Sequence, residues 1–160
     1  MKYKRLNSSE LENLKDDFIR FLASQGIDAE AWQKMKSDNV NAAEEIINIY
    51  SDLVYDQALS KCNYMEHVSA KEFKSLKFED SKTVVKGIKV KEGSDINLNT
   101  SNFQESVQIG LQNNEIEVFT ASKSHEKLRE QEMFDWIEKG GYMADEKWFN
   151  EVSRLIEHLK

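Results

Sequence analysis

The 160-residue chain lacks proline and has only six glycines and one cysteine. Without proline, its helices must end at glycines and polar caps. The lone Cys62 excludes an internal disulfide framework and fits a reducing compartment. No stretch approaches the roughly 18 consecutive apolar residues of a membrane span, and no apolar segment follows the basic start of the chain, Met1 to Leu6. We therefore expect a cytoplasmic protein with no membrane partner.

Sequence signatures for nucleotide and metal chemistry are also missing. Neither the dinucleotide-binding pattern G-x-G-x-x-G nor a phosphate-binding loop occurs, and Gly140-Gly141 is the only adjacent glycine pair. The three histidines and Cys62 are scattered, whereas a structural zinc site needs about four such ligands at close spacing. We therefore expect neither a cofactor nor a bound metal ion.

The composition of the sequence indicates that the chain folds. Apolar residues make up 39% and charged residues 32%, with eight Phe, five Tyr and three Trp. This composition is typical of a globular protein, and the length predicts one domain over residues 1–160. The net charge of −7 gives no general attraction to nucleic acid or to anionic lipid.

The N-terminal part has the spacing and the caps of helices. Ser9 with Glu12 forms a capping-box pattern, and Gly26 provides a stop signal. Asp28 is a candidate cap for a short second helix. A third helix is predicted from Asn41, with Glu44 in the capping-box position, to about Cys62. The first helix is apolar at helical spacing: Leu11, Leu14, Phe18, Phe21 and Leu22.

In the middle of the chain apolar and polar residues alternate as they do in strands. The C-terminal part again has the spacing of helices. Ser69 with Glu72 predicts a brief helix, and further helices are expected after Ser101, Ser124 and Asp145. The predicted strands are Tyr64–Val68, Thr83–Lys91 and Glu115–Ala121. The fold class is therefore α+β, with N-terminal helices, a small central sheet of about three short strands, and amphipathic C-terminal helices.

Cys62 and His67 are the weak catalytic candidates. A cysteine activated by a histidine can act as a nucleophile, as in a small hydrolase-like enzyme. Their five-residue spacing matches no known motif, and the favoured interpretation is a small buried thiol beside a polar strand end. The sequence therefore favours a protein that is not an enzyme.

A basic segment, residues 71–91, is the other candidate site. Phe73 and Phe78 are interleaved with its lysines, and lysines with exposed aromatic residues are the composition that binding to single-stranded RNA requires. A solvated strand face with inward aromatics would give the same pattern. The candidate binding residues are Lys71, Lys74, Lys77, Lys86, Lys89 and Lys91.

Several short motifs spread over the whole chain resemble a known family. They are Met1 to Leu6, Phe18 to Ala23, Trp32 after Asp28, Tyr50 to Val54, Tyr64 to His67, Glu117 to Ala121, and the closing amphipathic helix. The chain resembles a family of small proteins of unknown function from Bacteroidetes, some of which carry the label histidyl-tRNA synthetase. A synthetase needs an ATP site and a far longer chain, so the resemblance implies a shared fold and no reaction.

The sequence is compatible with three functional hypotheses. The leading one is a non-catalytic interaction module with an unidentified protein partner. The second is an accessory factor of translation, or of another RNA-containing assembly such as the ribosome, that binds through residues 71–91. The third is a small enzyme built around Cys62 and His67.

Overall fold

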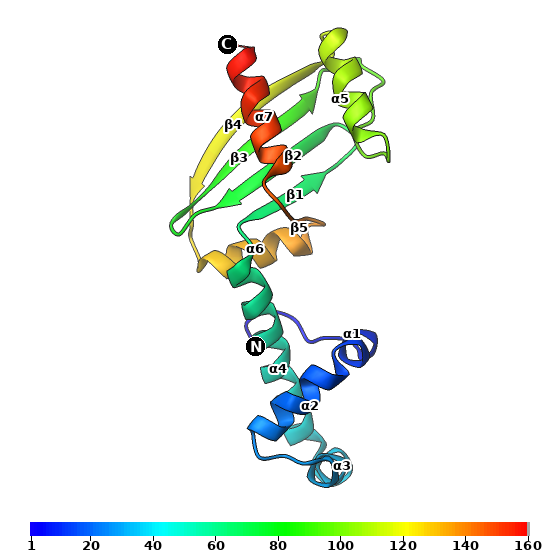
Figure 1. Ribbon diagram of the computed structural model, residues 1–160, viewed down its shortest axis with the longest axis vertical. Coiled ribbons are helices and arrows are strands. Elements are labelled where there is room, and N and C mark those ends of the chain that lie inside the picture. Colours follow the sequence, from blue (N-terminus) through cyan, green and yellow to red (C-terminus); the bar gives the residue numbers. More distant parts are fainter. Residues whose placement is uncertain (160) are drawn as a thin grey trace. The chain divides into compact units, whose positions relative to one another are not determined.

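A computed structural model describes residues 1–159 (Figure 1). The chain divides into two compact units, the first comprising residues 1–58 and the second beginning at Leu59. The boundary falls inside a long helix, α4 (Val40–Lys61). Each unit is described by itself.

The first unit is helical, and short polar side chains start its helices. It contains α1 (Ser8–Asn13), α2 (Lys15–Ser24), α3 (Ala29–Asp38) and most of α4. Asn7 and Glu10 form a capping box, in which the Asn7 side chain accepts from the Glu10 N–H at 2.9 Å. The predicted box at Ser9 and Glu12 was therefore placed two residues too late.

Two other predicted helix signals agree more closely with the structure. The Asp28 carboxylate accepts from the Ala31 N–H at 2.7 Å and caps α3 as predicted. Gly26, after α2, has a φ of 74°, which glycine adopts without strain. The cap of α4 is Asn39, whose side chain accepts from the Ala42 N–H, so the predicted cap at Asn41 was also two residues late.

Aromatic side chains hold the first unit together. Phe18 on α2 lies 4.9 Å from the Tyr50 ring and 5.4 Å from the Trp32 ring, between centroids. Tyr50 is fully buried, and its hydroxyl donates to Asp17 at 2.8 Å. Burying rings of this size contributes much of the free energy that holds a small helical unit.

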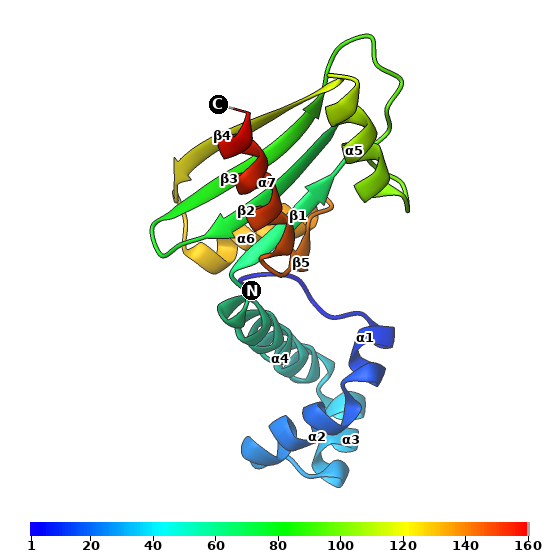
Figure 2. The same ribbon diagram turned by 45° about the horizontal axis from the view of Figure 1, so that its top comes forward.

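The second unit is a five-stranded antiparallel sheet with three helices. The strands are β1 (Tyr64–Val68), β2 (Glu72–Phe78), β3 (Lys82–Val90), β4 (Ile116–Ser124) and β5 (Tyr142–Ala144), in the order β4-β3-β2-β1-β5. The helices are α5 (Phe103–Gln112), α6 (Arg129–Glu138) and α7 (Lys147–His158). Figure 2 shows α5 and α7 on one side of the sheet and α6 on the other.

The α+β class is confirmed, but the prediction of about three strands was wrong. β2 replaces the brief helix expected after Ser69, because the Ser69 N–H donates to the Glu72 carbonyl and closes the turn between β1 and β2. β5 has only three residues and was not predicted. The helix expected from Ser124 starts at Arg129, because β4 continues as a strand to Ser124.

Alternation along the strands gives this sheet two different faces. We call the one packed by α5 and α7 the α7 face, and the one on which α6 lies the α6 face. The main core lies on the α7 face and comprises Phe73, Ile88, Val90, Leu98, Val107, Ile116 and Val152. On the α6 face, the His67 ring lies 5.7 Å from the ring of Trp136 of α6. β2 contributes to both faces, with Phe73 on one and Leu76 and Phe78 on the other.

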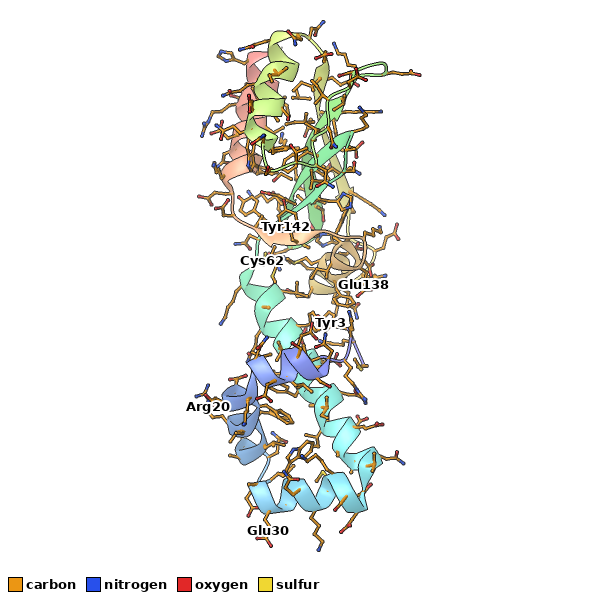
Figure 3. All side chains as sticks on the ribbon, turned by 90° about the vertical axis from the view of Figure 1, so that its right-hand side faces the viewer. Tyr3, Arg20, Glu30, Cys62, Glu138 and Tyr142 are labelled. Carbon is orange, nitrogen blue, oxygen red and sulfur yellow. The ribbon has the colours of Figure 1, made fainter. Side chains whose placement is uncertain are left out.

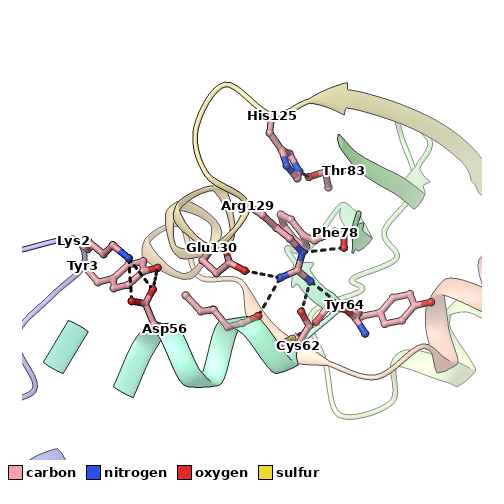
Figure 4. A network of polar contacts seen from close by, with 12 residues as sticks. Lys2, Tyr3, Asp56, Cys62, Tyr64, Phe78, Thr83, His125, Arg129 and Glu130 are labelled. Carbon is pink, nitrogen blue, oxygen red and sulfur yellow. Dashed lines mark hydrogen bonds and ion pairs between the residues drawn. The ribbon is translucent and has the colours of Figure 1, made fainter. Parts of the chain in front are cut away.

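One arginine ties the end of α4 to the sheet and to α6. The Arg129 guanidinium donates to the backbone carbonyls of Leu59, Cys62 and Phe78, and Figure 4 shows it between Cys62 and Phe78. It also donates to the Asn63 side chain and pairs with Glu130 at 3.2 Å. The carbonyls at a helix end have no partner within the helix, so Arg129 acts as a cap supplied from a distant part of the chain.

Replacing Arg129 by methionine should lower the free energy of unfolding by about 3 kcal/mol, because three carbonyls lose a charged donor. Chemical denaturation followed by circular dichroism measures the change. Arg154→Met is the matched control, since the side chain of Arg154 is 69% exposed and, within residues 1–159, forms an ion pair only with Glu151. Equal stabilities of the two variants would contradict the capping role.

Candidate functional site

An apolar groove lies in the helical unit. It measures about 530 Å³ and lies between α1 and α2 on one side and α3 on the other. Half-buried Phe18 and Trp32 line it together with Ile19, which is 53% exposed. The further apolar lining residues are Leu11, Leu22, Ala23, Ile27 and Ala29.

Helical spacing explains how this lining forms. Phe18, Ile19, Leu22 and Ala23 lie one turn apart in pairs, so they share one side of α2. Some of that side packs into the aromatic cluster, and the part closer to Ile19 remains open to solvent. The groove therefore has a rigid aromatic wall and an accessible aliphatic rim.

The polar rim of the groove carries both signs of charge. Lys15 and Lys36 line it, and so do Glu12 and Asp28. The ammonium of Lys36 lies 5.8 Å from the Trp32 ring centroid, within the range of a cation–π contact. The groove thus combines an apolar floor with charged margins, which suits a partner that has an apolar stripe between polar flanks.

Cys62 and His67 make separate contacts in the structure. Cys62 follows the last residue of α4 (Figure 3), and its thiol donates to the Tyr64 carbonyl at 3.0 Å. His67 contacts the Lys139 carbonyl at 3.0 Å through Nε2. Three steps of extended strand separate Tyr64 from His67, about 10 Å. Nothing in this arrangement directs the His67 ring to the Cys62 thiol.

The strand lysines of the basic segment divide between the two faces of the sheet. In the strand register Lys77 is opposite Val84 and Lys86 opposite Ser75, which places both lysines on the α7 face. Lys74 and Lys89 are on the α6 face, with Lys89 opposite Glu72. The four candidate lysines that lie on strands are therefore divided two and two between the faces of the sheet.

Several of the candidate lysines form hydrogen bonds or ion pairs within the second unit. The Lys71 ammonium donates to the carbonyls of Ser94 and Ile96, both at 2.8 Å. Lys91 donates to the Asn114 side chain at 2.9 Å. Lys74 pairs with Glu72 at 2.9 Å. Lys71 and Lys91 in particular hold loops, a structural role that the spacing of the lysines did not reveal.

A row of polar residues crosses all five strands on the α7 face. The register places Tyr142 opposite Glu66, Glu66 opposite Ser75, Ser75 opposite Lys86, and Lys86 opposite Thr120. The hydroxyl of Tyr142, which is labelled in Figure 3, donates to Glu66 at 3.2 Å. The Ser75 hydroxyl is buried and has no hydrogen-bond partner among the described residues.

Glu66 is the electrostatically unusual member of this row, because it is only 7% exposed. Burial raises the pKa of its carboxyl, and the nearby Asp145 adds to the rise. The hydrogen bond from Tyr142 and the charge of Lys147 lower the pKa in part. Burial and the Glu66 charge also raise the pKa of Tyr142. Glu66 therefore holds a proton more readily than a surface carboxyl does.

Sequence reasoning missed both of these sites. Glu66 was not among the candidate residues, although its position midway between Tyr64 and Val68 in a predicted strand places it on the same face as those two residues. Trp32 and Phe18 were assigned to helices, but whether they also line a groove depends on how α2 and α3 pack. No local signal encodes that packing.

The described residues contain neither a metal-binding cluster nor a membrane-spanning helix. No group of three or more His, Cys, Asp or Glu side chains is arranged to hold a metal ion there. Within residues 1–159, none of the helices combines the length and the apolar character needed to cross a membrane.

Comparison with known proteins identifies the chain at the level of its family. A model described as "Family of unknown function (DUF6495)" matches residues 1–157. The chain belongs to this family. Its match over nearly the full length confirms the resemblance to a family of unknown function. No curated protein and no solved structure matches the DUF6495 chain.

Replacing Glu66 by glutamine should change how stability depends on pH. The raised pKa means that folded wild-type protein binds a proton more tightly than unfolded protein, so its stability falls as the pH rises from the ordinary pKa of Glu through the folded-state value. Glutamine still accepts from Tyr142 and carries no charge. The free energy of unfolding of the variant, relative to that of the wild type, should therefore increase as the pH rises through this range.

Urea unfolding over a pH series measures this difference in stability, and Glu105→Gln on the exposed surface of α5 is the control. A stability difference between Glu66→Gln and wild type that stays constant with pH would show that the carboxyl has an ordinary proton affinity.

Proposed function

We propose that this DUF6495 protein is a non-catalytic interaction module that binds an amphipathic helix of a partner protein in the groove of its helical unit. The observation that carries the proposal is the exposed Ile19 beside the half-buried rings of Phe18 and Trp32. Large aromatic residues in a preformed pocket are frequent anchors of protein–protein binding.

The dimensions and the walls of the groove favour a helix as the occupant. α2 and α3 have ten residues each, which makes each about 15 Å long. This length accommodates two to three turns of a third helix, with apolar residues at three- and four-residue spacing facing the groove. The margins carry Lys15 and Lys36 as well as Glu12 and Asp28, so both flanks of the bound helix are expected to be charged.

Two further considerations support this proposal over the alternatives. The four candidate lysines on strands are divided between two faces, which weakens the case for one continuous RNA-binding stripe. The lone Cys62 fits a reducing compartment, so we place the binding in the cytoplasm. The groove is therefore the surface on which a search for a partner should concentrate.

Replacing Ile19 by glutamate should abolish partner binding, because it adds a charge where the apolar stripe of the partner would lie. Ile49→Glu is the matched control, since Ile49 is 48% exposed, against 53% for Ile19, and does not line the groove. The experiment is crosslinking in cells, followed by affinity purification and quantitative mass spectrometry of wild type and both variants.

The proposal expects a protein that wild type and Ile49→Glu recover and Ile19→Glu loses, with at least about a tenfold difference in yield. A peptide covering the crosslinked helix should then change the fluorescence of Trp32 in a variant in which Trp136 and Trp148 are replaced by phenylalanine. Equal recovery by all three proteins would rule out the groove as the binding site.

A further inference from the structure

The edge strand β4 has an unpaired outer side in the described chain. It is nine residues long, forms one margin of the sheet and pairs only with β3 (Figure 1). Residues 120–124 are all exposed. An exposed edge of this length is a template for another strand unless charge, proline or a bulge protects it. β4 has no proline, and its only charged residues are Glu117 and Lys123.

The hydrogen bonds at its two ends show which backbone groups of β4 face outward. The Lys91 N–H donates to the Glu115 carbonyl at 2.8 Å, and the His125 N–H donates to the Ser81 carbonyl at 2.9 Å. Hydrogen-bonded and non-hydrogen-bonded pairs alternate along an antiparallel ladder. The odd-numbered residues of β4 therefore bond to β3. The even-numbered residues, from Ile116 to Ser124, present their N–H and C=O groups to the outside.

The sequence of β4 complements itself when two copies run antiparallel about Thr120. In that register Ile116 is opposite Ser124, Val118 is opposite Ser122, and Thr120 is opposite its own copy. All these residues are even-numbered, so their outward backbone groups meet as hydrogen-bonded pairs. The register also uses all nine residues of the strand.

The side chains agree with this register. Glu117 of each copy is opposite Lys123 of the other, which gives two pairs of opposite charge. Opposite charges and Thr–Thr pairs directly across antiparallel strands are favourable. Within one copy, Glu117 is also opposite Lys89 on β3, and Lys123 forms an exposed ion pair with Glu126 at 3.6 Å. Both charged side chains therefore remain accessible to a second copy.

We propose that the partner of this edge is a second copy of the chain, which pairs β4 with β4 about a two-fold axis at Thr120 and joins the two sheets into one. The interface uses residues of the sheet unit and is distinct from the groove of the proposed function. It is held by main-chain hydrogen bonds of the even-numbered residues and by the two Glu117–Lys123 pairs.

Charge reversal in separate copies gives a test that a folding defect cannot imitate. Glu117→Lys and Lys123→Glu should each weaken dimerisation by at least about tenfold, because each creates two like-charge pairs. An equimolar mixture of the two variants should regain association, since every Lys then meets a Glu of the other copy. Sedimentation velocity over a concentration series measures both effects, and the double variant Glu117→Lys/Lys123→Glu should also dimerise.

A backbone variant tests the main-chain pairing. Ser122→Pro removes an outward N–H without removing a bond to β3, and proline is tolerated at a sheet edge. It should abolish the dimer while the melting temperature of the monomer stays close to that of wild type. Hydrogen exchange supplies an independent readout, because the amides of Val118, Thr120 and Ser122 should become protected only as the protein concentration rises.

Three results would overturn the proposal. They are a wild-type chain that stays monomeric over the whole series, a mixture of the two charge variants that associates no better than either variant alone, and a dimer that Ser122→Pro leaves intact.

Discussion

Backbone hydrogen bonding along an antiparallel ladder fixes the side to which every strand residue points, and the organisation of the sheet unit depends on this alternation. β2 supplies Phe73 to the core on the α7 face and Leu76 and Phe78 to the α6 face. The same rule separates Lys77 and Lys86 from Lys74 and Lys89. It also aligns the polar row through Glu66 and turns every second peptide group of β4 outward. A basic segment that looks continuous along the chain is thus divided by the sheet that it helps to form.

In the helical unit, core and surface are made from the same rings. Phe18 contacts the fully buried Tyr50 and also lines the groove, and Trp32 packs edge-on against Phe18 from α3. The shape of the groove is consequently set by the packing that stabilises the unit. A binding surface formed in this way loses little conformational entropy when it is occupied, which favours affinity for a partner of matching shape.

Local chemistry made the caps of the N-terminal helices predictable to within about two residues, whereas the helix expected from Ser124 starts only at Arg129. Asp28 was identified as a cap because a short acid before a helical run satisfies free N–H groups. β2 was missed because Ser69 and Glu72 are spaced like a capping box, and because Phe73 and Leu76 suit a helix as well as a strand. β5 is too short to show any period. The burial of Glu66 and the shape of the groove arise from packing between distant segments, so neither could be predicted from the spacing of residues.

The contacts of Arg129 have a consequence for the order in which the chain can fold. Its guanidinium meets the Leu59 carbonyl, 70 positions earlier, and β5 completes the sheet beside β1, with Tyr142 bonded to Glu66 across 76 positions. During synthesis, the end of α4 and the outer edge of β1 therefore emerge long before the segments that cover them. Closing such long loops lowers the entropy of the chain before the contacts can stabilise the fold. Contacts so distant in sequence therefore slow folding. The sheet unit should thus reach its native state only after nearly all of the chain has been made.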